Sequence, residues 1–246
     1  MTNRIELLVR RFMKAQSLGF GFYGTTKTKL PTEVFLAGKK RSLHLPQDPA
    51  LVAAIMDLWL DDEYGLAKVP KPVRTIVDIG ANVGLFSLWS VHNFPDAVIH
   101  SYEPSPELRR YFTANTADFP QVTFFNEGVS LNSGRAEMAS PSSSLIGITK
   151  PADSGAIVLT GIAEVMKRVG RPVDLMKIDC EGAEWDIFQD PASLRNVRHI
   201  RMEYHLVDGR SIKSLEEAAD AIGFKIIKRI DNAGFGIAHL SNKAAA

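Results

Sequence analysis

The 246-residue sequence contains a single cysteine, Cys180, so no intrachain disulfide can form. This scarcity of cysteine is typical of proteins in a reducing compartment. No run approaches the roughly 18 consecutive apolar residues that a membrane-spanning helix needs. The N-terminal stretch MTNRIELLVRRFMKAQ also lacks the continuous apolar segment of a signal peptide. We therefore expect a cytoplasmic protein with no membrane partner.

An excess of charge of one sign is lacking too. The formal net charge is +1, and the sequence has no run of basic residues. Because nucleic-acid-binding domains concentrate positive charge on one face, the sequence does not indicate a nucleic-acid partner. The apolar fraction of 45% is that of a globular protein, and the chain is long enough for one large α/β domain or two small ones.

The third absence concerns the spacing of glycines. Residues 78–84 read DIGANVG and stand between a strand-like apolar run and a helix-like one. Such a turn is typical of a nucleotide site, but the dinucleotide fingerprint requires G-x-G-x-x-G, and here Asn82 stands where the middle glycine would be. The phosphate-binding pattern G-x-x-x-x-G-K-[ST] does not occur either. The spacing therefore argues against dinucleotides and nucleoside triphosphates.

From residue 74 onward, apolar runs alternate with helical patterns. This alternation predicts parallel strands and a doubly wound α/β sheet. The final runs, 225–230 and 235–240, flank the turn 231–234 and predict an antiparallel C-terminal hairpin. A capping-box pattern at 214–217 predicts the start of the preceding helix. The parallel strands are expected at 75–79, 98–102, 122–125, 173–178 and 199–203.

The first 70 residues follow a different pattern. Apolar residues recur at helical spacing over 4–14 and 49–60, and the stretch between them is rich in glycine and proline. We expect residues 1–70 to form a helical cap on a main domain of residues 71–246. The pattern leaves open whether this segment is a fixed cap or a substrate lid.

A carboxylate, Glu103, ends the second predicted strand. It lies 25 positions after Asp78, close to the roughly 20-residue offset at which a carboxylate binds ribose hydroxyls. It would repel a 2′-phosphate and suits a nucleoside with free hydroxyls. Asp78 could meet an ammonium group of the same ligand, directly or through water.

Four segments together carry a family resemblance. VDIGANVGLFSL, SYEPSPELRRYFTAN, NEGVS and LMKIDCEGAEWDIF, followed by IRMEYH, resemble the FkbM family of S-adenosylmethionine-dependent methyltransferases over about residues 74–206. The resemblance implies a class I methyltransferase fold, with a seven-stranded sheet whose last strand is antiparallel. It also implies methylation of a small-molecule acceptor, most often at oxygen, as on sugars and natural products.

The resemblance assigns roles to individual positions. It implies that the methionine end of the methyl donor lies near the turn after the first strand, that Glu103 with Pro104 holds the ribose, and that Glu127 contacts the adenine. Asp179 then lies beside the transferred methyl group. The residues implied at the methionine end are Asp78, Gly80, Asn82 and Gly84.

An acidic cluster follows the fourth and fifth predicted strands. Asp179, Glu181 and His205 are our candidate catalytic residues, because an alcohol needs a base or a metal before it accepts a methyl group. His205 could be a general base, a metal ligand or a hydrogen-bonded strand-end residue. Asp179 and Glu203 could bind Mg²⁺, which prefers oxygen ligands.

Three residues in or beside this cluster have structural interpretations. Glu184 and Glu181 fit a helix expected over 181–190, in which Glu181 would benefit from the helix N-terminus. Lys177, inside a buried strand, should pair with one of the carboxylates.

The sequence leaves other functions open. An N-methyltransferase would use the same residues to orient an amine, and a non-catalytic partner protein could keep the fold without the reaction. A nicotinamide-dependent oxidoreductase is disfavoured by the glycine spacing. The serines of 140–144 could form a substrate loop. The sequence leaves the identity of the acceptor and the oligomeric state open, a homo-oligomer included.

Overall fold

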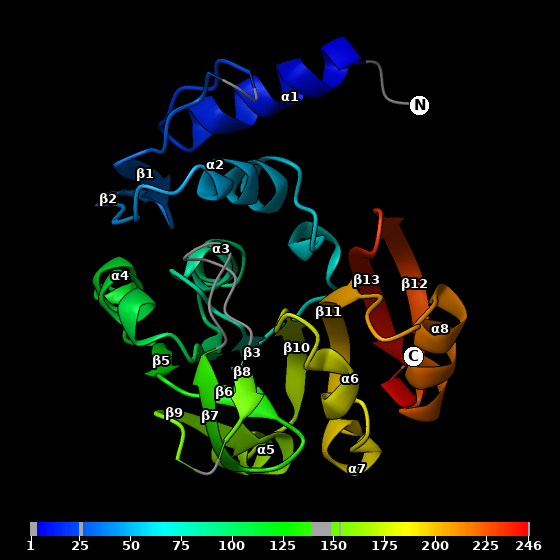
Figure 1. Cartoon of the computed structure of the whole chain (residues 1–246). Helices are drawn as coiled ribbons and strands as arrows, with labels where there is room; N and C mark the ends of the chain where they lie inside the picture. The colour runs from blue at the N-terminus through cyan, green and yellow to red at the C-terminus, as the bar shows by residue number, and fades with distance from the viewer. Residues whose placement is uncertain (1–3, 25–26, 139–148, 153, 246) are drawn as a thin grey trace.

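The computed structural model describes residues 4–24, 27–138, 149–152 and 154–245. Its centre is a seven-stranded sheet in the order β12-β13-β11-β10-β3-β4-β5 (Figure 1). Strands β11, β10, β3, β4 and β5 run parallel, whereas β13 is antiparallel to both β11 and β12. The fold class and the C-terminal hairpin are therefore confirmed. The strands span Thr75–Ile79 (β3), Val98–Tyr102 (β4), Val122–Phe125 (β5), Val173–Ile178 (β10), Val197–His205 (β11), Phe224–Asp231 (β12) and Phe235–Asn242 (β13).

Both faces of the sheet are covered. Side chains along a buried parallel strand alternate between the two faces, so each strand contributes to two apolar cores. Ile76 and Leu175 belong to the apolar core that includes α3 and the N-terminal segment. Val77 and Met176 belong to a second core on the other face, against α5 and α8. The helices of this domain are α3 (Leu85–Asn93), α4 (Pro106–Thr116), α5 (Ile162–Val169), α6 (Glu184–Ile187), α7 (Pro191–Leu194) and α8 (Ile212–Ala221), followed by a short 3-10 turn, η3 (Lys243–Ala245).

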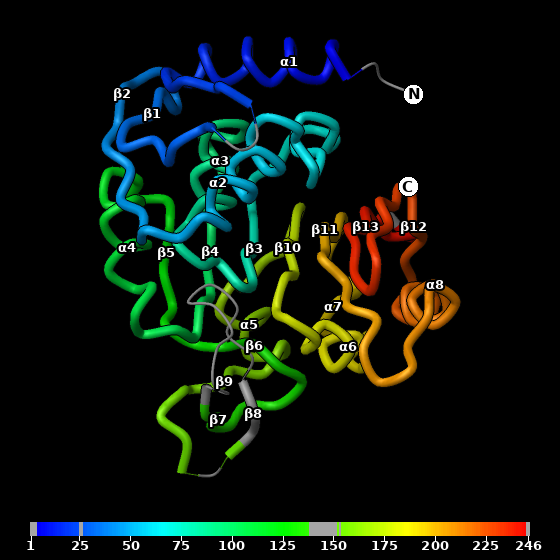
Figure 2. The backbone as a smooth tube through the Cα atoms, turned by 45° about the horizontal axis from the view of Figure 1, so that its top comes forward, coloured from blue at the N-terminus to red at the C-terminus, as the bar shows by residue number. Residues whose placement is uncertain are grey.

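The N-terminal segment packs on α3 and shares its core (Figure 2). Trp59 is fully buried, and its indole Nε1 donates to the carbonyl of Leu85 at 3.0 Å. The expected helices are present, the second as an α-helix that continues into a π-helix, but a hairpin was not expected. Whether the segment moves as a lid stays a prediction. Its elements are α1 (Arg4–Ser17), β1 (Glu33–Leu36), β2 (Lys39–Ser42), α2 (Ala50–Ile55), η1 (Met56–Leu60) and η2 (Leu66–Lys68).

A second, smaller sheet follows β5 and was also not expected. Its strand order is β6-β9-β7-β8, formed by Gly128–Ser130 (β6), Gly134–Met138 (β7), Thr149–Pro151 (β8) and Ile157–Gly161 (β9). The serines at 140–144, considered above as a substrate loop, lie outside the described residues. Within the described part of the chain, no helix is both long and apolar enough to cross a membrane.

Candidate functional site

The turn after β3 is held so tightly against β10 that its first residue must be glycine. Gly80 has φ of 75°, and a Cβ atom there would lie 1.7 Å from the carbonyl oxygen of Asp179. The backbone N–H groups of Gly80 and Ala81 both donate to the carbonyl of Tyr102, at 3.0 and 2.9 Å. The carboxyl ends of β3, β4 and β10 are thereby fixed against one another, at the edge where open α/β sheets bind ligands.

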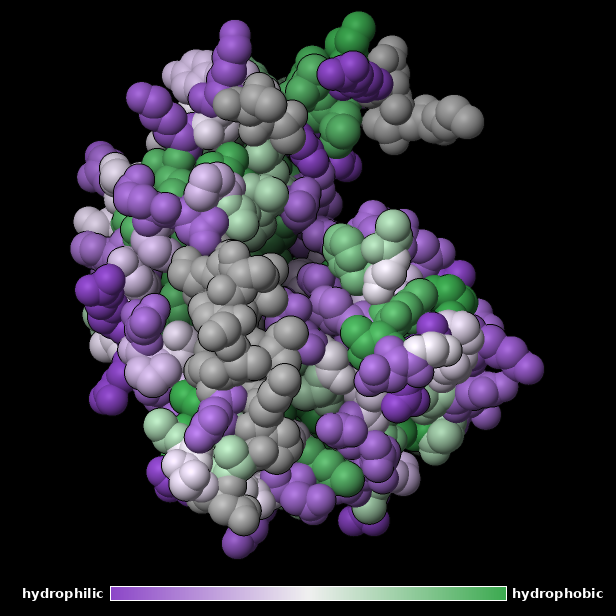
Figure 3. Space-filling model, viewed as in Figure 1, coloured by the Kyte–Doolittle hydropathy of each residue, from purple (hydrophilic) through white to green (hydrophobic). Residues whose placement is uncertain are grey.

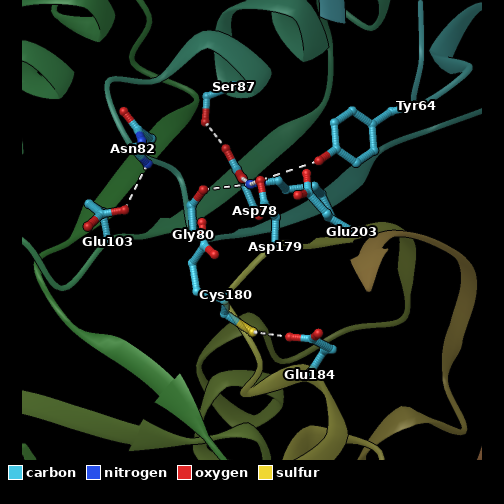
Figure 4. Close-up of polar contacts among 12 residues, drawn as sticks. Tyr64, Asp78, Gly80, Asn82, Ser87, Glu103, Asp179, Cys180, Glu184 and Glu203 are labelled. Atoms are coloured by element: carbon cyan, nitrogen blue, oxygen red, sulfur yellow. Dashed lines mark hydrogen bonds and ion pairs between the residues drawn. The ribbon is translucent and has the colours of Figure 1, made fainter. Parts of the chain in front are cut away.

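Glu103 is fixed in orientation beside this turn (Figure 4). One carboxylate oxygen accepts the backbone N–H of Asn82 and the other that of Ser105, each at 2.9 Å. The side chain is buried, and this burial raises the pKa of Glu103. We define the Glu103 pocket by its lining: Ile79, Gly80, Asn82, Tyr102, Glu103, Pro104, Gly128, Val129, Asp179, Cys180, Glu181 and Ala183.

Five of the predicted cofactor residues line this pocket: Gly80, Asn82, Glu103, Pro104 and Asp179. The other three lie outside its lining. Gly84 is the N-cap residue immediately before helix α3 and has a left-handed conformation, with φ of 91°. The carboxylate of Glu127 pairs with Arg168 at 2.7 Å, while its neighbour Gly128 lines the pocket.

Asp78 lies beneath the pocket and is fully buried. It accepts a hydrogen bond from the Ser87 hydroxyl at 2.7 Å and lies 3.7 Å from the ammonium of Lys177. Lys177 also contacts Asp179 at 3.1 Å and donates to the carbonyl of Gly80 at 2.5 Å. The prediction that Lys177 pairs with a carboxylate is confirmed.

Electrostatics keep Lys177 charged in spite of its burial. Burial lowers its pKa, but attraction to Asp179 and Asp78 outweighs that cost, and the pKa is raised overall. The charged side chain of Lys177, in β10, thereby links Asp78 of β3 to the glycine turn. Asp78 stabilises the Glu103 pocket through this ion pair and does not line the pocket itself.

A second cavity, of about 440 Å³, adjoins the first. Tyr64, from the N-terminal segment, enters it and donates its hydroxyl to Asp179 Oδ2 at 3.3 Å. Only 6% of Tyr64 is exposed. Tyr64 is not among the predicted site residues, because the sequence before residue 74 carries no motif. We define the Tyr64 cavity by its lining: Ala50, Leu51, Ala53, Ala54, Asp57, Leu58, Glu63, Tyr64, Gly80, Ala81, Asn82, Leu85, Phe86, Lys177, Asp179, Glu181, Glu203 and Phe235.

His205 is surrounded by three carboxylates. Its Nδ1 lies 3.2 Å from Glu184, and its Nε2 lies 3.4 Å from Glu181 and 3.5 Å from Glu203. Hydrogen bonds to Glu184 and Glu203 raise the pKa of His205 to about 10. The imidazole is therefore a cation at neutral pH, which favours positioning of the carboxylates over action as a base.

Glu184 and Glu181 differ in what they do. The buried carboxylate of Glu184 accepts the backbone N–H groups of Gly182 and His205, both at 2.8 Å, so it organises the turn. The helix expected over 181–190 is wrong at both ends: Glu181 has φ of 53°, and α6 spans only Glu184–Ile187. Gly182, also left-handed, breaks the helical pattern.

This left-handed turn places Glu181 in the lining of both cavities. Burial, followed by repulsion from Asp179, raises the pKa of Glu181 to about 7. Strained conformations and shifted carboxylate pKa values of this kind cluster at functional sites.

Across the described residues, no group of three or more His, Cys, Asp or Glu could hold a metal ion, so the predicted Mg²⁺ site at Asp179 and Glu203 gains no support.

The central sheet has seven strands, is mostly parallel and ends in an antiparallel hairpin, and the pocket lies where β3 and β10 meet. These features define a Rossmann-like methyltransferase fold. A pre-rRNA processing fibrillarin from Methanococcus jannaschii matches with a TM-score of 0.52 and 12% identity, over 89% of this chain and 84% of its own. A putative RNA methyltransferase from Pyrococcus horikoshii matches with a TM-score of 0.50 and 14% identity, over 95% and 98%.

The family follows from the sequence match. The model of the methyltransferase FkbM domain matches residues 78–227, more than half of the chain. The chain therefore belongs to the methyltransferase FkbM domain family.

Two curated relatives are much longer than the stretch they share with this chain. The AMB antimetabolite synthetase AmbE of Pseudomonas aeruginosa is 28% identical over 71% of this chain and 11% of its own length. The methyltransferase sdnD of Sordaria araneosa is 38% identical over 25% and 23%. The chain thus spans less than a quarter of either relative.

Proposed function

We propose that the protein transfers the methyl group of S-adenosylmethionine to a hydroxyl oxygen of a small molecule. The observation that carries the proposal is the position of Glu181 in the lining of both the Glu103 pocket and the Tyr64 cavity. The Glu103 pocket is the donor side, and the Tyr64 cavity is the acceptor side. The net charge of +1 supports a small molecule over a nucleic acid as acceptor.

The residues of the Glu103 pocket fit the donor. Both oxygens of Glu103 are held by backbone N–H groups, which aims the remaining lone pairs at a ribose diol. Gly80 lets the turn pack directly against Asp179, and both residues line the pocket in which the amino-acid end would lie. The bound donor supplies an activated methyl group on a sulfonium, so the protein has to provide alignment and a proton acceptor.

Glu181 is the proton acceptor in this proposal. A carboxylate with a pKa of about 7 is half ionised at neutral pH, and it can take a proton from an alcohol that attacks the methyl group. His205 holds Glu181 from one side, at 3.4 Å. Lys177 and the Tyr64 hydroxyl hold the adjacent Asp179, so two charged groups of the site keep fixed positions.

Calorimetry with S-adenosylhomocysteine and transfer of a ¹³C-methyl group test the proposal together. Wild-type protein should bind S-adenosylhomocysteine, and Glu103→Gln should weaken binding about 10- to 100-fold, because one N–H donor would then face an amide NH₂. Glu181→Gln should leave that affinity within a few-fold but slow methyl transfer by about 10²–10⁴. Absence of S-adenosylhomocysteine binding by the wild type would refute the function.

An N-methyltransferase is the second candidate. The observation in its favour is the number of carboxylates that line the Tyr64 cavity, since these would attract an amine. The ¹³C chemical shift of the transferred methyl group separates the two, because O-methyl and N-methyl carbons resonate in different ranges. An N-methyl product would decide for this second candidate.

A further inference from the structure

The Tyr64 cavity carries more negative charge than its own cations balance. Among the described residues that line it, Lys177 is the one cationic side chain, and it is already engaged with Asp78 and Asp179. Figure 4 shows Tyr64, Asp179 and Glu203 converging on the same space. The carboxylates in its lining are Asp57, Glu63, Asp179, Glu181 and Glu203.

These carboxylates lie at two ends of the cavity. Glu181 also lines the Glu103 pocket, so it marks the end at which the methyl group is transferred. Asp57 and Glu63 also line a third cavity, of about 740 Å³, together with residues of the N-terminal segment and of β12. Figure 3 shows the surface hollowed between these two parts of the molecule. Asp57 and Glu63 therefore mark the distal end.

Glu63 has no counter-ion at this distal end. No cationic side chain of the described residues lies within ion-pairing distance of it, whereas Asp57 has Arg11 at 3.6 Å. Burial, and then repulsion from Asp57 and Glu203, raises the pKa of Glu63 to about 7. An ionised group in this position is stabilised when a ligand brings a positive charge.

The walls of the cavity indicate the kind of cation independently of its charge. Leu58, Leu85, Phe86 and Phe235 line it, and these side chains suit a carbon skeleton. A metal ion would need several protein ligands at one point, and within the described residues no group of three or more His, Cys, Asp or Glu could hold one. The cavity therefore fits an organic cation.

We propose that the methyl acceptor is a small amino alcohol, whose hydroxyl lies at Glu181 and whose ammonium group is bound by Glu63 and Asp57. This inference rests on the proposed function and names its substrate class. An ammonium held by carboxylates keeps its proton, and its nitrogen then has no lone pair to attack the methyl group. The distal carboxylates would thus both anchor the acceptor and direct methylation to oxygen.

The test compares two probes that differ in one group: 2-aminoethanol and ethylene glycol. Each is titrated at pH 8 into protein saturated with S-adenosylhomocysteine, and the NMR chemical shifts of residues lining the Tyr64 cavity report binding. We expect 2-aminoethanol to bind at least tenfold more tightly, because charge-assisted hydrogen bonds are about twice as strong as neutral ones. Glu63→Gln and Asp57→Asn should each reduce that preference severalfold. Glu107→Gln, at an exposed position of α4, is the matched control and should not change it.

The outcomes separate this inference from the function on which it rests. If S-adenosylhomocysteine does not bind, the proposed function fails. If it binds and the two probes have equal affinity, the amino-alcohol inference is overturned while the methyltransferase proposal stands. A preference that survives unchanged in both Glu63→Gln and Asp57→Asn would overturn the assignment of the ammonium to these residues.

Discussion

Gly80 and Gly38 offer a comparison in which backbone conformation is constant and only the space available to a side chain differs. Gly80 has φ of 75° and Gly38 has φ of 76°. A Cβ atom at Gly80 would lie 1.7 Å from the carbonyl oxygen of Asp179, whereas no heavy atom of the described residues lies within 4 Å of one at Gly38. Replacing each glycine by alanine therefore separates the cost of the conformation from the cost of the clash.

The magnitudes follow from these contacts. Left-handed φ costs an alanine about 1–2 kcal/mol, and this is all that Gly38→Ala should lose. Gly80→Ala must also push Asp179 away from the turn. That movement disturbs the hydrogen bonds from Asp179 N–H to Ile79 and from Lys177 to Gly80. At about 1 kcal/mol for each bond, together with the 1–2 kcal/mol of strain, we expect a loss of about 3–4 kcal/mol for Gly80→Ala.

Urea denaturation at neutral pH measures both losses, and calorimetry with S-adenosylhomocysteine measures the effect on the Glu103 pocket. Gly38→Ala should bind the ligand like the wild type, because β1 and β2 are remote from the pocket lining. Gly80→Ala should lose detectable binding even where the protein remains folded. Equal destabilisation in the two variants, or normal binding by Gly80→Ala, would refute the inference that close packing against Asp179 requires glycine at position 80.

Three further perturbations test other parts of the structure. Lys177→Met should destabilise the fold by about 3–5 kcal/mol, because it leaves Asp78 buried without its counter-ion. In urea denaturation, the double variant that also carries Asp78→Asn should recover part of that loss. Absence of any recovery would contradict the ion pair. His205 has a folded-state pKa of about 10 against an ordinary 6.5, so its contribution is fully present below pH 6.5 and is lost as the pH rises toward 10. His205→Gln should therefore remove that part of the decline in stability measured from pH 6.5 to 10, and an unchanged decline would show that other groups cause it. Ser211→Ala should cost about 1 kcal/mol of unfolding free energy, because the Ser211 side chain caps helix α8. Unchanged stability in urea denaturation would argue against the cap.

The strands of the central sheet could be predicted from the sequence because their side chains are buried on both faces. The four runs expected at 75–79, 98–102, 122–125 and 173–178 coincide with β3, β4, β5 and β10. Continuous apolar runs bounded by turn residues are the signal of such strands. The start of α8 was misplaced: the expected capping box at 214–217 gives way to one in which Ser211 is the cap and Ser214 its partner. The pattern of the box names Glu or Gln at the partner position, and here that position is serine.

The polar site was predictable only in part, for a physical reason. Side chains near the carboxyl ends of parallel strands converge on one edge of the sheet, so Asp179, Glu203 and His205 could be grouped in advance. The left-handed conformation of Glu181 could not be foreseen, because only glycine, asparagine and aspartate adopt it often enough to signal it. That conformation places Glu181 between the two cavities, and a helical residue at the same position would point elsewhere.

The Glu103 pocket and the Tyr64 cavity differ in how much of their lining lies inside the family match. The family match begins at residue 78 and includes the glycine turn, Glu103 and the residues after β10. Asp57, Glu63 and Tyr64 precede that match and line the Tyr64 cavity. In the function proposed above, the matched part would bind the donor, while the cap would contribute the charges that select the acceptor. If both proposals hold, relatives that keep the matched domain but replace the cap should share the donor and differ in acceptor, because Asp57 and Glu63 would be lost from the cavity lining.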